Sequence, residues 1–295
     1  MKIFITGGSG LLGQYLNIEL SKNHEILTQY NQHTGNCKEF NSVQLTIIDF
    51  EKLEQVYKTF KPEIVIHTAA VSNPEKVDAL LPNQVYGFNV NATKEIALLC
   101  KKYNARIVYT STDSVYAGYR GSMLKEDAKL IPISLYAETK LMGEIKIQET
   151  FDNYLILRLP LLIGIGLNHS TNNFHKMYFN LRDGKPVKLF TDQYRSPLAL
   201  HETSRIIHEL TEKKINKEII NLAGDERVSR FQLGEMLCDI TGFDKNLLIP
   251  TTMDEARLLY KVADVSMSNE KLKSFGVKLQ PLRNMIEESL TFHHE

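Results

Sequence analysis

The amino-terminal stretch constrains the fold more than any other part of this sequence. Residues 2–6 form an apolar run of β type, a glycine-rich turn follows over residues 7–13, and a helical pattern continues to Leu20. Glycine lacks a Cβ and tolerates positive φ, so such a turn can bring the backbone against a pyrophosphate. The helix that follows directs unpaired N–H groups and its positive dipole end at the same anion. This order of strand, turn and helix predicts a dinucleotide-binding site.

Two glycine spacings fit this turn, and either one alone is a weak signal. Gly8, Gly10 and Gly13 give one spacing, whereas Gly7, Gly10 and Gly13 give the other. Thr6 before the turn, taken with the motifs far downstream, favours the second. The residues that this reading places at the cofactor are Gly7, Gly10, Leu11, Leu12 and Gly13.

Composition excludes several classes of function. Lys and Arg number 35, as do Asp and Glu, and no basic stripe is present, so nucleic-acid binding is not expected. No apolar run approaches the ~18 residues of a membrane span. The three cysteines are far apart and lack metal-ligand spacing, which predicts buried thiols, a cytoplasmic location and no metal site.

Apolar strands alternate with helical segments over the first half of the chain. Strands are expected at residues 25–30, 43–48, 64–67, 106–111 and 154–159, and helices at 51–60, at 75–102 with a break near Leu81-Pro82, and around 136–140. A last strand at 218–223 is expected to rejoin the sheet. This rhythm predicts an α/β fold with a doubly wound parallel sheet of Rossmann type.

The sequence also predicts two coupled parts. Residues 1–163, with about 201–224, form the dinucleotide-binding Rossmann domain. Residues of about 164–200 and 225–295 form a smaller, discontinuous substrate-binding part.

The stretch Tyr136-Ala-Glu-Thr-Lys140 carries the second decisive pattern. Ser134 is a plausible N-cap for a helix here, and Tyr136 and Lys140 share one helical face at i and i+4. A free tyrosine has a pKa of about 10, so it is a poor proton shuttle at neutral pH. A nearby ammonium would lower that pKa and suit Tyr136 to acid–base work.

Together these motifs resemble the extended short-chain dehydrogenase/reductase superfamily over nearly the whole chain. The matching segments are Thr6-Gly7-x-x-Gly10-x-x-Gly13, Ala69-Ala70, Asn89 in Asn-Val-Asn-Ala-Thr, Ser111 to Tyr116, Tyr136-x-x-x-Lys140 and Arg158-x-Pro160. The resemblance implies a nicotinamide cofactor contacted by Ala69, Ala70 and Asn89. It implies that Tyr136 exchanges a proton with the substrate oxygen, that Thr112 orients this oxygen, and that Lys140 binds the nicotinamide ribose and lowers the pKa of Tyr136. His67, at a strand end, is expected to be a core histidine rather than a base.

Within that superfamily the sequence most resembles the dTDP-4-dehydrorhamnose reductase group. Ser111-Thr112-Asp113 is similar to its active-site strand, and Asp192-Gln193 followed by Pro197 is similar to its substrate loop. Asp113 and Arg195 are therefore candidate substrate-binding residues. Arg195 stands where small residues are more usual, and it either binds a nucleotide diphosphate or is a solvated loop arginine.

The end of the second strand bears on the choice of cofactor. NAD enzymes of this fold often place a carboxylate there, but residues 30–33 are Tyr, Asn, Gln and His. NADP(H) is therefore favoured and NAD(H) is possible, with Asn31 beside the ribose and His33 or Lys38 near a 2′-phosphate. Asp49 and Phe50 would border the adenine, although Asp49 is equally suited to cap the next helix.

The leading hypothesis is an NADP(H)-dependent reductase of a 4-keto sugar nucleotide, with Tyr136 as proton donor. One alternative is a sugar-nucleotide epimerase of the same superfamily with tightly retained NAD. Another is a non-catalytic NADP-binding regulatory subunit similar to that of methionine adenosyltransferase, because an intact Tyr/Lys pair does not prove turnover. Family habit suggests a homodimer.

Overall fold

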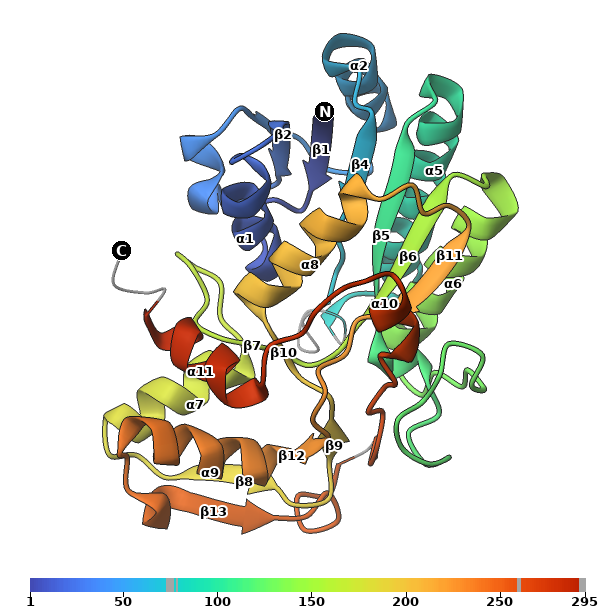
Figure 1. The fold of residues 1–295 in the computed structure, drawn as a ribbon. Coiled ribbons are helices and arrows are strands. Elements are labelled where there is room, and N and C mark those ends of the chain that lie inside the picture. Colours follow the sequence, from blue (N-terminus) through green and yellow to red (C-terminus); the bar gives the residue numbers. More distant parts are fainter. Residues whose placement is uncertain (73–76, 78, 259–260, 292–295) are drawn as a thin grey trace.

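Seven parallel strands form the central sheet of the computed structural model, which describes residues 1–72, 77, 79–258 and 261–291 (Figure 1). The strands are β1 (Lys2–Thr6), β2 (Glu25–Tyr30), β3 (Ser42–Gln44), β4 (Ile64–His67), β5 (Arg106–Thr112), β6 (Tyr154–Leu159) and β11 (Glu218–Asn221). Their order is β11-β6-β5-β4-β1-β2-β3. The strand order reverses between β1 and β4, and the carboxyl ends of strands at such a point form a ligand-binding crevice. The predicted doubly wound sheet is confirmed, including the return of the last strand beside β6.

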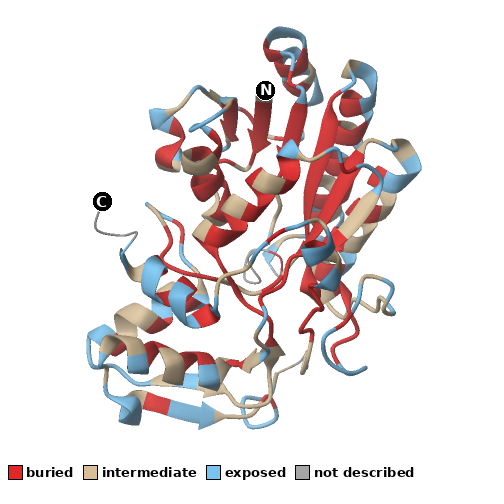
Figure 2. Ribbon diagram, viewed as in Figure 1, coloured by how far each residue is buried: buried red, intermediate tan, exposed pale blue. Residues whose placement is uncertain are grey.

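Helices cover both faces of this sheet, because alternate side chains of a strand point to opposite faces. Ile3 and Ile5 of β1 pack with α1 (Leu11–Leu20) and α8 (Leu200–Glu212), whereas Phe4 packs with α2 (Phe50–Phe60) on the other face. The second face also carries α5 (Ala92–Tyr103) and α6 (Leu135–Thr150). Figure 2 shows the buried sheet between these half-exposed helices.

A smaller group of elements lies beyond the carboxyl ends of the strands (Figure 1). Three two-stranded sheets belong to it: β7 (Leu162–Ile163) with β10 (Leu198–Ala199), β8 (Val187–Phe190) with β13 (Leu248–Thr251), and β9 (Tyr194–Arg195) with β12 (Val228–Ser229). Its helices are α7 (Asn173–Arg182), α9 (Arg230–Thr241) and α11 (Leu282–Thr291), whereas α10 (Glu270–Ser274) lies beside β11 of the central sheet. The chain enters and leaves this group more than once, so its residues come from separate stretches.

Two expected elements differ in extent. The strand expected at 43–48 ends at Gln44, because its neighbour β2 ends at Tyr30 and β3 has no partner on its other side. The helical stretch expected at 75–102 consists of α4 (Pro82–Tyr86), a π-helical turn (Gly87–Asn91) and α5. Residues 73–76 and 78 of that stretch lie outside the described residues. A short 3₁₀ helix (Gly35–Glu39) occupies part of the expected loop at 31–41.

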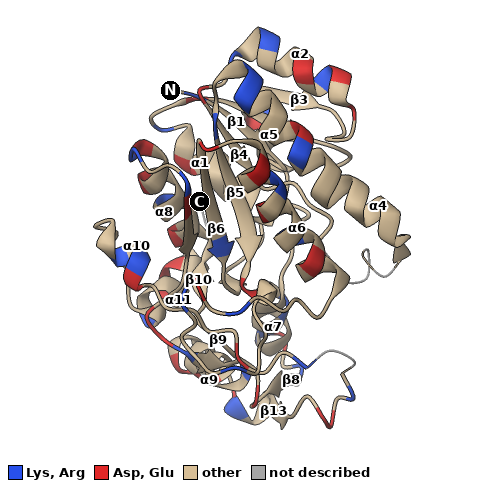
Figure 3. Ribbon diagram, turned by 90° about the vertical axis from the view of Figure 1, so that its right-hand side faces the viewer, with Lys and Arg blue, Asp and Glu red and all other residues tan. Residues whose placement is uncertain are grey.

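The surface and the thiols agree with the composition. In Figure 3, Lys and Arg alternate with Asp and Glu over the outer helices rather than gathering in one patch. Cys37, Cys100 and Cys238 are all buried free thiols, as predicted. Within the described ranges, no helix is both long enough and apolar enough to cross a membrane.

A buried ion pair joins α6 to the sheet. Arg158 of β6 donates from Nε (3.1 Å) and Nη2 (2.9 Å) to the two carboxylate oxygens of Glu144 on α6. Its Nη1 donates to the hydroxyl of Tyr116 at 2.8 Å and to the carbonyl oxygen of Glu126 at 2.9 Å. The two charged side chains are only 2% and 1% exposed, so their charges depend on each other for compensation.

Replacing Glu144 by Gln should therefore destabilise the protein by roughly 3–5 kcal/mol, because it leaves the Arg158 charge buried without a counter-charge. The midpoint of urea unfolding measures this loss. The double variant Glu144→Leu/Arg158→Met removes both charges and should recover most of it. A Glu144→Gln variant whose free energy of unfolding lies within about 1 kcal/mol of that of the wild type would behave like the loss of an exposed pair. That result would contradict a buried ion pair at this place.

Candidate active site

The glycine turn after β1 is shaped by close backbone contacts. Gly7 has a φ of +72°, and a Cβ there would lie 2.7 Å from the amide nitrogen of Ala69. A Cβ on Gly13 would lie 2.1 Å from the carbonyl oxygen of Gly7. Gly8 is excluded from substitution for another reason, because its Cβ would lie 1.6 Å from Oγ1 of Thr28 in β2. The three glycines of the favoured spacing line a cavity, whereas Gly8 packs against the sheet.

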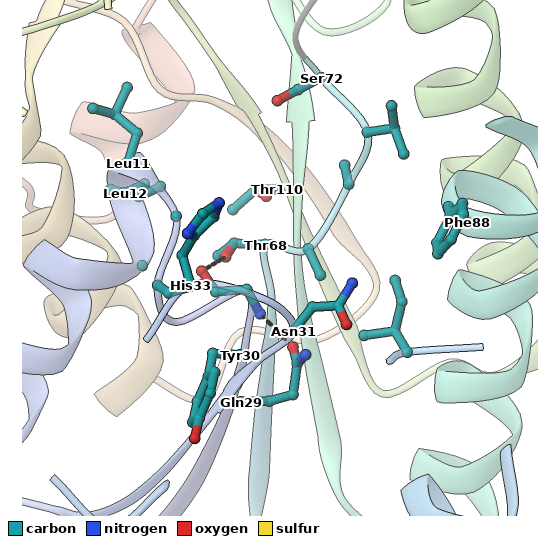
Figure 4. A pocket seen from close by; sticks show the side chains of 18 of the residues that line it. Leu11, Leu12, Gln29, Tyr30, Asn31, His33, Thr68, Ser72, Phe88 and Thr110 are labelled. Atoms are coloured by element: carbon teal, nitrogen blue, oxygen red, sulfur yellow. Dashed lines mark hydrogen bonds between the residues drawn. The ribbon is translucent and has the colours of Figure 1, made fainter. Parts of the chain in front are cut away.

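That cavity has a volume of about 700 Å³ and runs along the carboxyl ends of β2, β1, β4 and β5 to α6. Figure 4 shows side chains that line it, among them Asn31, His33 and Thr68. The predicted cofactor residues that line it are Gly7, Gly10, Leu11, Leu12, Gly13, Asn31, Ala69, Ala70, Tyr136 and Lys140. Other lining residues were not predicted from the sequence, among them Gln29, Thr46, Ile47 and Thr68, whereas Ser111 belongs to the predicted active-site strand. Gln29 shapes the turn directly, since its Oε1 accepts from the backbone N–H of Gly7 at 2.8 Å.

Three predicted cofactor residues do not line the cavity. Asp49 accepts a hydrogen bond from the backbone N–H of Lys52 at 3.2 Å and so caps α2, which was the alternative role predicted for it. Phe50 is the first residue of that helix, and it is 40% exposed. The chain leaves the sheet after Gln44, so Thr46 and Ile47 reach the cavity in their place. The side chain of Asn89 is buried and bonds both backbone groups of Val71 and the hydroxyl of Thr139. Asn89 therefore positions the cavity wall.

His67 is confirmed as a satisfied core histidine. Its Nδ1 lies 2.7 Å from Oγ1 of Thr6, and its Nε2 lies 2.9 Å from Oγ1 of Thr93. Burial, together with the charge of Lys140, lowers the pKa of His67 to about 3, so the ring is neutral. This bonded chain ties β4 to β1 and α5 beneath the cavity floor.

Helix α6 brings Tyr136 and Lys140 to the inner end of the cavity. Ser134 caps it as expected, with Oγ accepting from the backbone N–H of Ala137 at 3.3 Å. Lys140 is buried, and its Nζ lies 4.1 Å from the ring centroid of Tyr109. Thr112, at the end of β5, hydrogen-bonds Tyr136. The predicted trio is therefore assembled at one place, although Thr112 itself does not line the cavity.

The pKa of Tyr136 moves opposite to the expected direction. Desolvation, followed by the negative charge of Asp113, raises it to about 12, and the hydrogen bond with Thr112 lowers it only in part. Lys140 does not offset this, because burial lowers its own pKa to about 7 and its ammonium faces the Tyr109 ring. At neutral pH Tyr136 is thus a phenol that carries the proton a carbonyl oxygen would accept.

Lys140→Met should raise thermal stability, since a lysine whose pKa is about 7 when folded and 10.5 when unfolded opposes folding. The unfolded chain binds more protons between these values, so the penalty is complete below pH 7 and vanishes above pH 10.5. At about 1.4 kcal/mol per pKa unit it reaches at most roughly 5 kcal/mol. Unfolding free energies of both proteins from pH 6 to pH 9.5 should converge as pH rises. A constant difference would refute the shifted pKa.

A charged cluster lies beside this trio. Nε of Arg195 is 3.5 Å from Oδ2 of Asp113, and both side chains are buried. Arg195 also donates to the carbonyl oxygens of Tyr194 and Val262, so the solvated-loop reading of Arg195 is wrong. Burial raises the pKa of Asp113, and the charge of Arg195 opposes this rise.

Arg230 joins this cluster and was not found from the sequence. Burial and the nearby charge of Arg195 lower its pKa to about 9, against the opposing effect of Asp113. Its Nε donates to Oε1 of Gln193 at 3.0 Å. Arg230 is the first residue of α9, where a cation opposes the helix dipole. This unfavourable position of a cation was the feature of the sequence that could have marked Arg230 as a functional residue. Two guanidinium groups thus face the carboxylate of Asp113, and Asp264 places a second negative charge near Arg195.

The cavity fits an NAD(P) dinucleotide. The glycine turn and the amino terminus of α1 stand where a pyrophosphate binds in this fold. At the other end, the buried hydroxyl of Ser111 lines the cavity and has no hydrogen-bond partner within the described part of the chain. Fold and site together define an extended short-chain dehydrogenase/reductase.

Comparison with known proteins identifies the family. The chain belongs to the RmlD substrate binding domain family, whose pattern matches residues 1–294. A dTDP-4-dehydrorhamnose reductase from Bacillus anthracis, solved in complex with NADP, superimposes with a TM-score of 0.84 at 21% identity and covers 99% of both chains. The predicted resemblance is confirmed.

Two curated relatives have different roles. Methionine adenosyltransferase 2 subunit beta from Mus musculus is 26% identical over 98% of this chain and 87% of that protein. A probable low-salt glycan biosynthesis reductase from Haloferax volcanii is also 26% identical, over 86% of this chain and 84% of its own length. Membership of the family is thus compatible with a reductase or with a subunit of another enzyme.

Proposed function

We propose that this protein is an NADP(H)-dependent reductase of a 4-keto sugar nucleotide. The observation that carries the proposal is the convergence of Thr112, Tyr136 and Lys140 at the inner end of a cavity that begins at the glycine turn. Bound NADPH would supply a hydride to C4 of the sugar. Tyr136 then donates its phenolic proton to the carbonyl oxygen, Thr112 holds that oxygen in place, and the product is an alcohol.

We further propose that the residues of about 164–200 and 225–295 bind the nucleotide part of the substrate. The charged cluster supports this, because both guanidinium groups that face Asp113 come from these stretches. The amino terminus of α9 adds the positive end of a helix dipole beside Arg230. Guanidinium forks and a helix amino terminus are the groups that bind phosphates in proteins.

Tyr136→Phe should lower the rate of NADPH oxidation with a 4-keto sugar nucleotide by at least about a hundredfold, since general acid catalysis contributes roughly 10²–10⁴. NADPH affinity should change little, because only the hydroxyl is lost. Absorbance at 340 nm measures turnover. Tyr103→Phe is the matched control, since its hydroxyl bonds Glu54 away from the cavity, and it should stay active. Full activity of Tyr136→Phe would end the assignment of the proton donor.

NADP(H) is the proposed cofactor, with NAD(H) as the alternative. The ends of β2 and β4 that line the cavity present Tyr30, Asn31, Gln32, His33 and Thr68, so no carboxylate from these segments repels a 2′-phosphate. The rings of His33 and His169 lie 4.7 Å apart at the cavity, whereas Lys38 does not line it. His33 is therefore the stronger of the two candidates for that phosphate.

Asn31→Asp adds one charge with almost no change of shape, so it tests this choice. NADPH binding should weaken by about tenfold at low salt, and NADH binding should stay equal or strengthen, because the carboxylate repels a 2′-phosphate and accepts from a ribose hydroxyl. Fluorescence titration of the reduced cofactors measures both. Asn41→Asp places the same charge at a residue that does not line the cavity and should have little effect. Equal losses for both cofactors would exclude this reading.

The second candidate function is a regulatory subunit, favoured by the relationship to methionine adenosyltransferase 2 subunit beta over nearly the whole chain. A protein of this kind would bind NADP and oxidise no NADPH with any 4-keto sugar nucleotide, yet it would change the kinetics of a methionine adenosyltransferase. If the wild type oxidises NADPH with such a substrate and Tyr136→Phe abolishes this activity, regulation is excluded as the sole role of the protein.

A further inference from the structure

Two histidines that are far apart in the sequence meet at the carboxyl end of α1. His24 follows the carboxyl terminus of α1, and His208 lies in the last turns of α8, which packs beside α1 (Figure 1). Their Nε2 atoms are 3.1 Å apart, and both side chains are largely buried, 6% and 10% exposed. Glu212, one turn after His208, directs Oε1 at the same point.

We propose that His24, His208 and Glu212 form a binding site for a divalent transition metal ion of the Zn²⁺ class. Oε1 of Glu212 is 3.6 Å from each Nε2, which is too long for a hydrogen bond. It is a suitable separation for two ligands of one ion. Zinc–nitrogen and zinc–oxygen bonds of 2.0–2.2 Å in a tetrahedron place neighbouring ligand atoms about 3.3–3.6 Å apart. The observed triangle has edges of 3.1, 3.6 and 3.6 Å.

A fourth residue fixes the orientation of one ligand. Nδ1 of His208 lies 3.0 Å from Oε1 of Glu19, and a carboxylate only accepts, so the proton of a neutral His208 is on Nδ1. Its Nε2 therefore presents a lone pair to the centre of the triangle. Metal-binding histidines commonly donate their other ring N–H to a carboxylate in this way.

The surroundings favour a cation. The carboxyl ends of α1 and α8 meet here, and each carries partial negative charge. Glu212 is 53% exposed, so the fourth coordination position opens to solvent and can hold a water molecule. A bound ion would join the last turn of α1 to that of α8. The site is independent of the proposed reductase function, because α1 separates it from the glycine turn by about 15 Å.

Competition with a chromophoric chelator tests the site. Chelator-treated protein should bind one equivalent of Zn²⁺ from ZnCl₂ with micromolar or tighter affinity, and its unfolding temperature should rise with Zn²⁺ concentration. Mg²⁺ should have no such effect, because it prefers an all-oxygen octahedron. A site of roughly micromolar affinity is filled at about 100 µM free Zn²⁺. Failure of the protein to bind one equivalent at that concentration overturns the proposal.

Matched variants locate the ion. Glu212→Gln removes an exposed ligand and should weaken Zn²⁺ binding at least about tenfold, and Glu19→Gln should weaken it by roughly 10–100-fold through His208. Glu209→Gln lies on the same helix, but its carboxylate pairs with Arg205 and Lys213, so Zn²⁺ affinity should be unchanged. All variants are made with His293→Asn and His294→Asn, which removes a competing histidine pair. Equal affinity in Glu212→Gln and Glu209→Gln would refute the site.

Discussion

The buried ion pair between Arg158 and Glu144 is the interaction on which the geometry of the active site depends. Glu144 lies on α6, two turns after Tyr136 and one turn after Lys140, so anchoring it to β6 sets the rotation of the helix that carries both residues. Arg158 also holds the hydroxyl of Tyr116, which in turn donates to Asn221 of β11 at 2.8 Å. The guanidinium group of Arg158 thus connects β6 to α6 and to Tyr116, and through Tyr116 to β11.

The cofactor end of the cavity works by a different principle, because it depends on backbone rather than charge. Gly7 and Gly13 let β1, β4 and α1 approach within distances that any Cβ would prevent. The resulting floor presents backbone N–H groups and the helix dipole to an anion. Charged side chains are concentrated instead at the other end, around Asp113, Arg195 and Arg230. This division supports the proposal that the backbone turn binds the cofactor and that the guanidinium cluster binds the substrate.

The sequence was sufficient where the determinants are local. The glycine turn, the alternation of strands and helices, the Ser134 cap and the i,i+4 relation of Tyr136 and Lys140 all lie within short windows, and the structure contains each of them. Features that depend on long-range packing could not be predicted from the sequence. The pKa of Tyr136 depends on Asp113 and on water excluded by the whole site, and Arg230 reaches the cluster only through the fold of the smaller part. Asp49 and Asn89 have structural roles away from the cavity lining: Asp49 caps α2 locally, whereas Asn89 bridges Val71 and Thr139, which are distant in the sequence.

The state of Lys140 bears on whether the site is catalytic. A buried lysine with a pKa near 7 opposes folding, and its ammonium is offset only by the Tyr109 ring and the more distant charge of Glu144. A purely structural role would be served better by an apolar side chain of similar volume, since burying a charge without a close partner is unfavourable. Sites that place such a group in a cavity, within reach of a protonated tyrosine, are typical of proton transfer. A subunit that only binds the dinucleotide would also use Lys140, through the ribose contact that the family resemblance implies, so the choice between turnover and regulation depends on Tyr136 rather than on Lys140.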